Sequence, residues 1–367
     1  MRVDRTSAPA DGEHHTGAQV VSAHVTGVGT ALPRAFDQQA VWDGYFREHF
    51  GGSRVAERIF RSVAVSRRHA VVSPLDEDLS GTSTDARMRR YEEFAPGLGH
   101  AAATAAIESA GLTPADVGQL TVVSCTGYTA PGLDTLLAAS LDLPDRARRL
   151  LVGHMGCYAA LPALAATADF VVAHQRPAVL LCVELTSLHL QPPTREVQQV
   201  VSHALFSDAA AAIVLRPGDA PGGLELLGTA SHTDVTTRDH MTWRITDHGF
   251  RMDLSPHVPE VLGKHVGTEV EDLLAEHGLV PSDVRGWAVH PGGPRILATV
   301  ERELDLPAAA LEHSRHVLRE HGNCSSATVL LVLDRLLSRG GLRPGDPVVA
   351  MAFGPGLTLC AALLRVT

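Results

Sequence analysis

The feature that most constrains this chain is a repeat at a fixed distance. Residues 111–117 (GLTPADV) are closely matched by residues 278–284 (GLVPSDV), a displacement of 167 residues from 111 to 278. The same displacement carries residues 155–157 (Met-Gly-Cys) onto residues 322–324 (Gly-Asn-Cys), and each triplet opens an Ala/Leu-rich stretch. Gly-Leu-x-Pro-x-Asp is also a common sequence for ending a helix and starting a turn, but two matches at one offset favour an internal duplication.

Apolar runs with β-forming residues alternate with segments of helical periodicity in both repeats. This alternation is typical of mixed α/β layers in which helices cover sheets. Because residues 216–223 are rich in Pro and Gly, we expect a tail over 1–20, one half over 21–220 and a second half over 221–367. The predicted strands are 120–123, 150–152, 179–183, 210–215, 287–289, 348–352 and 357–364, and the predicted helices are 97–110, 133–141, 157–172, 261–277, 295–304 and 325–337.

Charge and composition exclude several classes of partner. The 367 residues include 41 acidic and 31 basic side chains, and a net charge of −10 without a long basic run argues against nucleic acid or an anionic membrane. The longest apolar runs, 178–183 and 357–364, are shorter than the roughly 20 residues of a membrane span. Five scattered cysteines form no disulfide framework, and residues 1–18 resemble neither a signal nor a transit peptide. We therefore expect a cytoplasmic protein that acts on small molecules.

Cys157 is a candidate nucleophile because of its place in the chain. It follows Gly-His-Met-Gly, where a short strand gives way to an apolar helix. A thiol at a helix amino terminus meets unpaired N–H groups and the positive end of the helix dipole, and both favour the thiolate. The alternative is a small buried hydrophobic residue at a tight turn, which is the usual role of a lone cysteine.

His290 and Asn323 are candidate partners of that thiol. His290 ends the apolar run 287–289 and enters a Pro-Gly-Gly-Pro turn, which places its ring at a strand end; for any one of 20 histidines the alternative is a surface or core role. A neutral imidazole can take a proton from sulfur or stabilise charge on a thioester oxygen. Asn323, the one asparagine in the chain, offers two donors to the same oxygen. Its alternatives are a helix N-cap and a glycosylation sequon.

Two other uses of these residue types are not supported by their spacing. No Cys-x-x-Cys or His-x-x-x-His pair has a partner at zinc-finger spacing, so we expect no structural metal. No Gly-x-x-x-x-Gly-Lys-Ser/Thr sequence is present to cradle a phosphate. We therefore expect a site without a resident cofactor.

Six short motifs occur in order along most of the chain. They are SCTG with APGLD (124–134), GHMGCYAA (153–160), ALFSD (204–208), HPGGP (290–294), GNCSSA (322–327) and FGPG (353–356). In these motifs the sequence resembles the type III polyketide synthases, relatives of chalcone synthase in the thiolase superfamily. The resemblance extends from about Val25 to Val366.

The resemblance implies a five-layered αβαβα thiolase fold made of two duplicated halves, an obligate homodimer, and a Cys–His–Asn site where the halves meet. It implies that Cys157 carries the starter acyl group and the growing chain as a thioester. His290 and Asn323 would assist decarboxylation of malonyl-CoA and stabilise the oxyanion of condensation. The implied enzyme is an acyltransferase that condenses malonyl-CoA repeatedly onto an acyl-CoA starter and cyclises the product to a pyrone, resorcinol or phloroglucinol-type ring.

The resemblance also assigns residues around the reacting atoms. Phe206 matches the gatekeeping phenylalanine between a CoA tunnel and the cavity, and Met252 falls at a second gatekeeper position where plant members carry phenylalanine. Positions that vary with starter size and cyclisation mode match Cys125, His189 and Ser325, and contacts to the CoA phosphates are expected from Arg58, Arg61 and Arg295.

Three residues depart from the pattern of the family. Ser207, Ala209 and Ala352 stand where glycine is usual, and we expect each added β-carbon to reposition a loop at the cavity without removing a catalytic group. Three other functions stay open: a ketoacyl synthase III-like enzyme that performs one condensation on carrier-protein substrates, a catalytically silent thiolase-fold module, and a Cys-dependent hydrolase.

Overall fold

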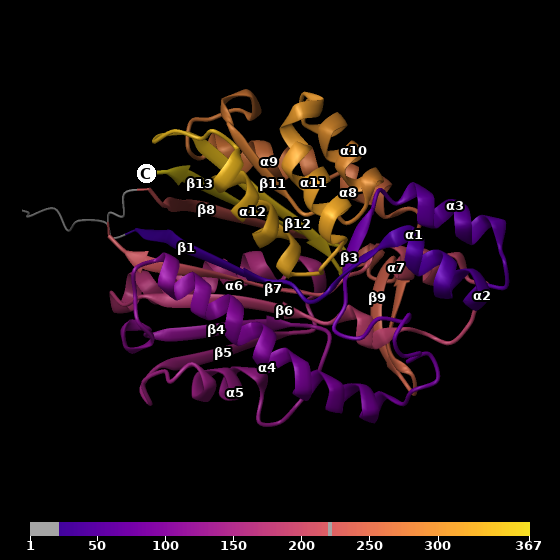
Figure 1. Cartoon of the computed structure of the whole chain (residues 1–367). Coiled ribbons are helices and arrows are strands. Elements are labelled where there is room, and N and C mark those ends of the chain that lie inside the picture. The colour runs from indigo at the N-terminus through magenta and orange to yellow at the C-terminus, as the bar shows by residue number, and fades with distance from the viewer. Residues whose placement is uncertain (1–21, 219–221) are drawn as a thin grey trace, which may run out of the picture.

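The computed structural model describes residues 22–218 and 222–367, in which strands and helices alternate as predicted (Figure 1). The first half contains β1 (Ala23–Ala31), β2 (Ala35–Asp37), α1 (Gln38–Val41), α2 (Arg47–His49), α3 (Arg54–Ser62), β3 (Arg67–His69), α4 (Thr84–Ser109), β4 (Gln119–Ser124), α5 (Leu133–Ser140), β5 (Arg148–Gly153), α6 (Ala160–His174), β6 (Ala178–Glu184), α7 (Val197–Leu205) and β7 (Ala209–Pro217). The second contains β8 (Leu224–Thr233), β9 (Met241–Thr246), β10 (Gly249–Leu254), α8 (Val258–Gly263), α9 (Val266–Ala275), β11 (Gly286–Val289), α10 (Pro294–Glu303), α11 (Glu312–His321), α12 (Ala327–Arg339), β12 (Pro347–Gly354) and β13 (Thr358–Val366). The tail over 1–20 and the division after residue 220 lie outside the described residues.

Four strands of the first half, β4, β6, β7 and β1, pair in the same pattern as β11, β12, β13 and β8 of the second, and β5 is an additional edge strand of the first half. In the first half β5 and β6 pair in parallel with β4, and β7 and β1 follow in antiparallel order. In the second half β11 pairs in parallel with β12, and β13 and β8 follow in antiparallel order. Two residue pairs, His24 with Glu225 and Val25 with Leu224, join the sets into one nine-stranded sheet. The halves therefore repeat one design along a narrow seam.

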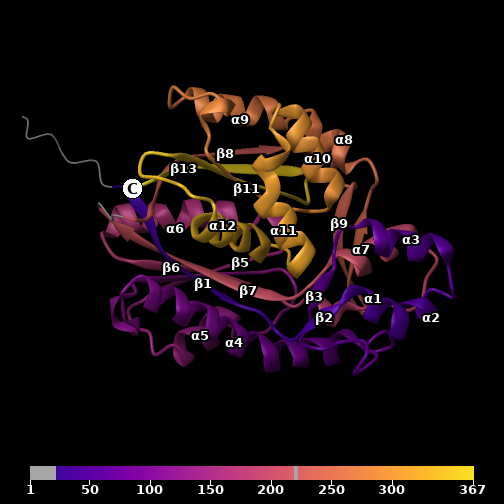
Figure 2. The same ribbon diagram turned by 45° about the horizontal axis from the view of Figure 1, so that its top comes forward.

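Helices cover both faces of each set of strands and create five layers (Figure 2). α4 and α5 lie outside the first set, α8, α9 and α10 lie outside the second, and α6 and α12 lie between the two and contact both. Alternate residues of β7 belong to the outer cluster of the first half and to the central cluster. Alternate residues of β12 divide in the same way between the central cluster and the outer cluster of the second half. The predicted αβαβα layering is confirmed.

The repeated sequence takes the same local structure in both copies. Each copy forms a 3₁₀ turn, over Pro114–Asp116 and Pro281–Asp283. In each turn the carboxylate of the last residue accepts the backbone N–H of the residue before the turn, at 2.8 and 2.9 Å. α6 begins at Ala160 and α12 at Ala327, which differ by the displacement seen in the sequence. The two central helices are therefore structural equivalents.

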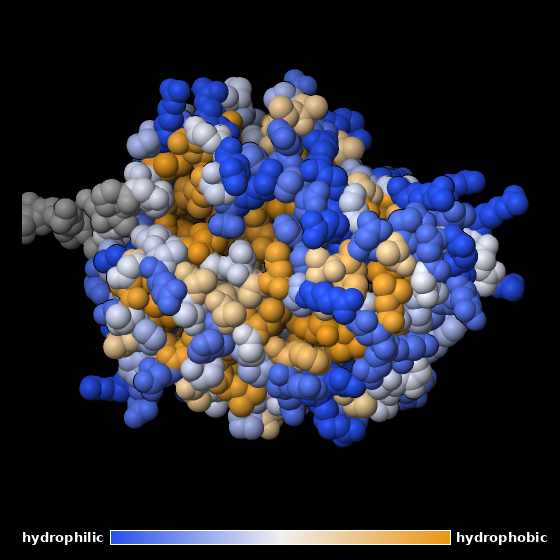
Figure 3. Space-filling model, viewed as in Figure 1, coloured by the Kyte–Doolittle hydropathy of each residue, from blue (hydrophilic) through white to orange (hydrophobic). Residues whose placement is uncertain are grey.

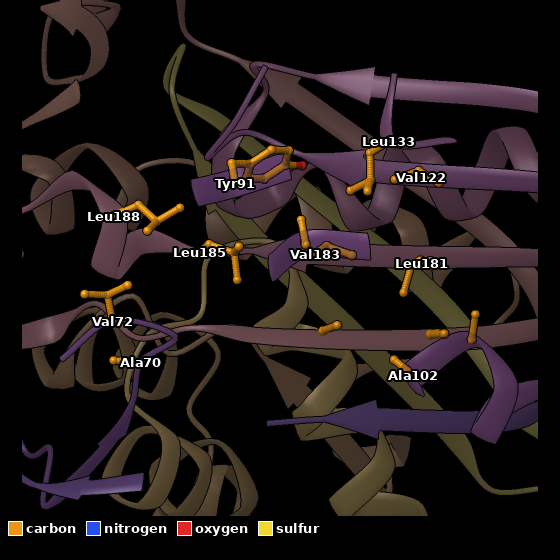
Figure 4. Packing of buried hydrophobic residues seen from close by; sticks show 14 of the residues in the cluster. Ala70, Val72, Tyr91, Ala102, Val122, Leu133, Leu181, Val183, Leu185 and Leu188 are labelled. Carbon is orange, nitrogen blue, oxygen red and sulfur yellow. The ribbon is translucent and has the colours of Figure 1, made fainter. Parts of the chain in front are cut away.

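The helix predicted over 97–110 begins too late. α4 continues through Pro96 toward its amino terminus and starts after Ser83, whose side chain accepts the N–H of Ala86. Arg87 and Tyr91, in the part that was not predicted, are fully buried, and Figure 4 shows Tyr91 among the apolar side chains of the outer cluster. Burial of this face outweighs the proline that normally ends a helix pattern.

The helix predicted over 261–277 is two helices, α8 and α9. α8 ends at Gly263, a residue that weakens a helix interior. The hairpin of β9 and β10 was not predicted at all, and neither were β8, α7, α11 and the six strands and helices between Ala23 and His69. β9 and β10 each alternate apolar and polar residues, a strand pattern that the prediction did not use, and residues of both strands border the site described below.

Among the described residues, one helical stretch, Gly156–His174, is long and apolar enough to cross a membrane. In the sequence, polar residues divide it into shorter apolar runs, so it does not stand out there. Of its most apolar window, 61% is buried. It lies in the central layer against both sets of strands, where the core helix of a layered protein belongs. On the face drawn in Figure 3, apolar residues gather in separate patches among hydrophilic ones.

Candidate active site

Three side chains from different elements border one cavity of about 650 Å³: Cys157, His290 and Asn323. Cys157 lies in the turn between β5 and α6, and Asn323 lies in the equivalent turn before α12. His290 follows β11 directly, at the strand end where the sequence predicted it. The carboxyl ends of β5 and β11 and the amino ends of the central helices thus converge where the halves meet.

The Cys157 thiol is buried, with 5% of the residue exposed, and its Sγ lies 3.7 Å from Ser325 Oγ. Burial raises the pKa of the thiol to about 12, although hydrogen bonds from Ser325 and Asn323 act in the opposite direction. The expected stabilisation of the thiolate by a helix terminus is outweighed by this desolvation. In the free protein the sulfur is therefore a protonated thiol at neutral pH and needs a base.

His290 is a buried neutral base at the cavity wall. Its backbone N–H donates to Met351 O at 2.7 Å, which fixes the start of the turn after β11. Burial lowers the pKa of its imidazole to about 3, so the ring carries no charge at neutral pH. Among the described residues neither ring nitrogen has a hydrogen-bond partner. Both nitrogens are free for a thiol or a substrate oxygen in the cavity.

Asn323 is held on both its backbone and its side chain. Its N–H donates to Leu205 O and its carbonyl accepts from Ser207 N, both at 2.9 Å. Its Oδ1 accepts the N–H of Ser325 at 2.9 Å. Since the oxygen is engaged, the amide NH₂ is the group that faces Cys157, whose pKa it lowers. The donor is therefore fixed in place before substrate arrives.

Beneath the thiol lies a polar cluster that the sequence did not predict as a unit. Cys125 Sγ lies 3.4 Å from Ser325 Oγ, so the serine hydroxyl sits between two thiols. Glu184 is fully buried and accepts from Cys125 N at 3.1 Å, Thr126 Oγ1 at 2.9 Å and Ser326 Oγ at 2.5 Å. Burial raises the pKa of Glu184, and these hydrogen bonds oppose the shift. In the sequence, the one sign of this cluster was Glu184, a carboxylate that directly follows the predicted apolar strand 179–183.

The two predicted gatekeepers border a second, small hollow of about 60 Å³. Met252 borders both the hollow and the large cavity, and the backbone of Phe206 forms a bridge with that of Asn323. His189 lines the hollow, with its ring stacked on Phe250 at a centroid distance of 4.5 Å. Burial lowers the pKa of His189 to about 3. Cys125 and Ser325 border neither cavity; Ser325 contacts the Cys157 thiol, and Cys125 contacts Ser325.

The three arginines predicted to bind CoA phosphates have different surroundings. Arg295, at the start of α10, is exposed and borders the large cavity. Arg58 and Arg61 are exposed on α3, whose residues Ile59 and Ser62 border the cavity. Arg61 is paired with Glu57 at 2.7 Å. The structure thus places one of the three cations on the cavity wall and two on a helix that borders the cavity.

The three residues that replace glycine border neither cavity. Ser207 Oγ accepts from His69 N at 2.7 Å and donates to His69 O at 3.2 Å, so this side chain ties β3 to the segment of Phe206. Ala209 and Ala352 are fully buried in the central cluster. The β-carbons of the two alanines therefore pack between the sheets. Of the three replacements, Ser207 is the one that acts near the cavity, through its hydrogen bonds that hold the segment of Phe206.

Family models match nearly the whole chain. The model of the amino-terminal domain of chalcone and stilbene synthases matches residues 13–219, and that of the carboxy-terminal domain matches residues 227–367. The chain belongs to the chalcone and stilbene synthase family. It is a type III polyketide synthase, an enzyme of the acyltransferase class, and the resemblance seen in the motifs is confirmed.

Individual relatives give the same result. The chain is 35% identical to a 1,3,6,8-tetrahydroxynaphthalene synthase of Streptomyces peucetius subsp. caesius, over 100% of this chain and 99% of that protein. It is 34% identical to a 3,5-dihydroxyphenylacetyl-CoA synthase of Streptomyces toyocaensis, over 93% and 89%. The crystal structure of the tetrahydroxynaphthalene synthase of Streptomyces coelicolor A3(2), a bacterial type III polyketide synthase, superposes with a TM-score of 0.88 at 28% identity, over 94% of this chain and 99% of that one.

Proposed function

We propose that this synthase loads an acyl group from acyl-CoA onto Cys157, extends it repeatedly with malonyl-CoA, and cyclises the product. The observation that supports these roles is the meeting of a thiol, a neutral imidazole and a fixed amide donor at one cavity. The names of the relatives, a tetrahydroxynaphthalene and a dihydroxyphenylacetyl-CoA synthase, favour aromatic ring products within the expected range of pyrones, resorcinols and phloroglucinols.

Loading needs a proton acceptor because burial keeps the thiol protonated. The imidazole of His290 takes the thiol proton as sulfur attacks the starter carbonyl, and CoA leaves as a thiolate that receives that proton. The NH₂ of Asn323 stabilises the tetrahedral oxyanion in this step. The products are free CoA and an acyl thioester on Cys157.

Extension uses the same donors on a different carbonyl. When the malonyl group loses CO₂, the electron pair of the broken C–C bond becomes an enolate, whose oxygen receives hydrogen bonds from Asn323 and a ring N–H of His290. The enolate carbon attacks the acyl thioester and releases the Cys157 thiolate. The lengthened chain is then a CoA thioester that can return to the cysteine. Decarboxylation itself supplies the nucleophile, so the proposed chemistry uses CoA thioesters as substrates and no resident cofactor.

We also propose a homodimer in which the edge strand β5 is covered by a second copy. β5 pairs with β4 on one side, and its Leu150 and Leu151 are 38% and 47% exposed. Tyr128, on the loop after β4, is 64% exposed. An unpaired apolar edge favours association. Leu151→Arg should convert a dimer to a monomer in sedimentation velocity, and a monomeric unmodified protein would contradict the proposal.

The localisation that fits this enzyme is the cytoplasm. All five cysteines are free and buried, including those beneath the site, and acyl thioester chemistry on Cys157 requires a reduced sulfur. This supports a reducing compartment.

The decisive experiment omits carrier protein. Purified protein receives an acyl-CoA starter and ¹³C-labelled malonyl-CoA, and products are analysed by mass spectrometry. We expect labelled, cyclised products that are lost in the Cys157→Ala variant. A requirement for carrier protein would indicate a ketoacyl synthase instead, free acid as the sole product a hydrolase, and malonyl-CoA consumption that is unchanged by Cys157→Ala a silent module.

A further inference from the structure

Ser207 is a buried serine that borders neither cavity, and all of its polar groups are engaged. Its Oγ accepts the N–H of His69 at 2.7 Å and donates to the carbonyl of the same residue at 3.2 Å. Its N–H donates to Asn323 O at 2.9 Å, and its carbonyl accepts from Thr186 Oγ1 at 2.9 Å. This one residue therefore connects β3 to the backbone of the residue that carries the amide donor.

A pair of histidine rings makes a second connection between β3 and the same turn. His69 Nδ1 lies 2.9 Å from Pro33 O, and His69 Nε2 lies 3.0 Å from His321 Nδ1. A carbonyl only accepts, so a neutral His69 carries its proton on Nδ1 and accepts from His321 through Nε2. Burial lowers the pKa of both rings, that of His321 to about 4, so the pair is neutral at pH 7. The ring of His321, the last residue of α11, is thereby held two residues before Asn323.

Together these contacts close a ring around the turn before α12. Through its backbone His69 holds Ser207, and through its imidazole it holds His321. Asn323 pairs with the first of these residues and follows the second in the chain. Between them lies Gly322, with φ of 72°, where an added β-carbon would lie 2.9 Å from Ser207 Cβ. The serine side chain therefore packs directly against this glycine, and His69 fixes the backbone of Asn323 from both sides.

We propose that Ser207 and the His69–His321 pair are positioning residues that hold the amide of Asn323 where it donates to the substrate oxygen. This inference rests on the proposed function, and it adds residues that act through the amide rather than on the substrate. Oxyanion donors are effective because they are fixed before the charge develops. Since misplacing a group at an active site by about 1 Å can cost about 10²-fold in rate, the support of this donor should be measurable.

Release of CO₂ from malonyl-CoA without a starter tests the proposal, because the proposed decarboxylation depends on Asn323. Ser207→Ala removes the hydroxyl and keeps the β-carbon that packs against Gly322. We expect this variant to lower kcat of decarboxylation by about ten- to one-hundredfold. KM for malonyl-CoA should stay within about threefold, because the weakened interaction forms in the transition state. Ser207→Gly, which restores the residue that is usual in the family, should show at least the same loss of kcat.

Ser109, at the end of α4, provides a matched control. Its Oγ accepts from Val28 N at 2.9 Å and donates to Val28 O at 3.0 Å, which are the same two bonds to one residue. It is exposed and borders neither cavity, so Ser109→Ala should leave kcat of decarboxylation unchanged. At the ring pair, His321→Leu should lower kcat, and His321→Asn, which keeps a donor near the position of Nδ1, should restore part of it.

A double-mutant cycle separates positioning from general structural support. In the Asn323→Ala background, Ser207→Ala should have no further effect on kcat, because the amide that it positions is absent. Additive losses would overturn the proposal and leave the proposed function in place, and so would a loss in Ser207→Gly that matches its unfolded fraction in urea experiments. Unchanged decarboxylation in Asn323→Ala would instead contradict the proposed role of the amide itself, and this inference with it.

Discussion

The starts of the two central helices are equivalent in position and different in chemistry. The displacement of 167 residues places Cys157 before α6 where Cys324 lies before α12. Cys157 borders the large cavity, whereas Cys324 is fully buried and its Sγ lies 3.4 Å from His321 O. In the second half the preceding residue, Asn323, takes the place at the cavity.

This difference shows what a duplicated scaffold provides. Both turns bring a left-handed glycine close to the cavity, Gly156 with φ of 79° and Gly322 with φ of 72°. Both then expose the residue that follows that glycine to the site. One half supplies the nucleophile there and the other supplies the oxyanion donor. Cys157 and Asn323 are 166 residues apart, one fewer than the displacement of the repeat, so the two halves present neighbouring positions of the same turn to the site and give them different roles.

The largest expected effect is the difference in activity between variants of the two cysteines. Cys157→Ala should lower product formation by about 10⁴-fold or more, since a nucleophile has no substitute. Cys324→Ala should keep activity within a few-fold and lower the free energy of unfolding by about 1 kcal/mol, because it removes one small buried group. Both are measured by product formation and urea unfolding. Equal losses of activity would contradict the comparison.

Asn323 should have the next largest effect. Asn323→Ala removes one preorganised donor and should lower the decarboxylation rate of malonyl-CoA by about 10²- to 10³-fold. Thr328→Ser, which keeps the hydroxyl 3.5 Å from Asn323 Oδ1, is the matched control and should stay within a few-fold. The measurement is CO₂ release in the absence of a starter. An unchanged rate in Asn323→Ala would remove the amide from the mechanism.

The buried histidines of the two halves should respond alike to acid. The pKa values of His189 and His290 are both lowered to about 3 by burial, so the unfolded chain binds protons near pH 6.5 that the folded chain does not. Stability is therefore fully present above pH 6.5 and is lost as pH falls toward 3, by about 1.4 kcal/mol per pH unit for each histidine.

Urea unfolding at pH 7, 6 and 5 measures that slope. Each of His189→Gln and His290→Gln should flatten it by about 1.4 kcal/mol per pH unit. His257→Gln, an exposed histidine, should leave it unchanged. A slope as steep in His290→Gln as in the unmodified protein would mean that this ring is charged in the folded protein.

The smallest effect should come from the alanines that replace glycine. Ala209 at the start of β7 and Ala352 in β12 are fully buried in the central layer. Ala→Gly at either position should lower the free energy of unfolding by about 0.5–1 kcal/mol through backbone entropy and a small loss of packing. Calorimetry measures both variants. A clear change in the product pattern of either one would instead link it to the cavity.

Much of the scaffold follows from short-range patterns in the sequence. Strands such as β4, β6 and β12 are apolar runs with clear ends, and the repeat predicts that the helices before residues 111 and 278 and after residues 159 and 326 are equivalent. Positions at the ends of these elements could therefore be predicted, among them Cys157, His290 and Asn323.

The rest depends on contacts between distant segments. Nothing in its local sequence shows that Arg68 is buried, because β3 has three residues and its neighbour Arg67 is exposed. Glu184 becomes part of the site through hydrogen bonds from Cys125 and Ser326, which come from both halves. The thiol pKa was predicted in the wrong direction because burial is a property of the assembled layers.

Because α6 lies in the central layer, one of its faces packs against strands that are synthesised much later. This helix leaves the ribosome roughly 170 residues before β12, one of the strands that cover its second face. At ordinary translation rates that interval is on the order of 10–30 s. Throughout it, a segment as apolar as a membrane span has one side without its native cover. Efficient production of the enzyme should therefore depend on chaperones that shield the nascent first half.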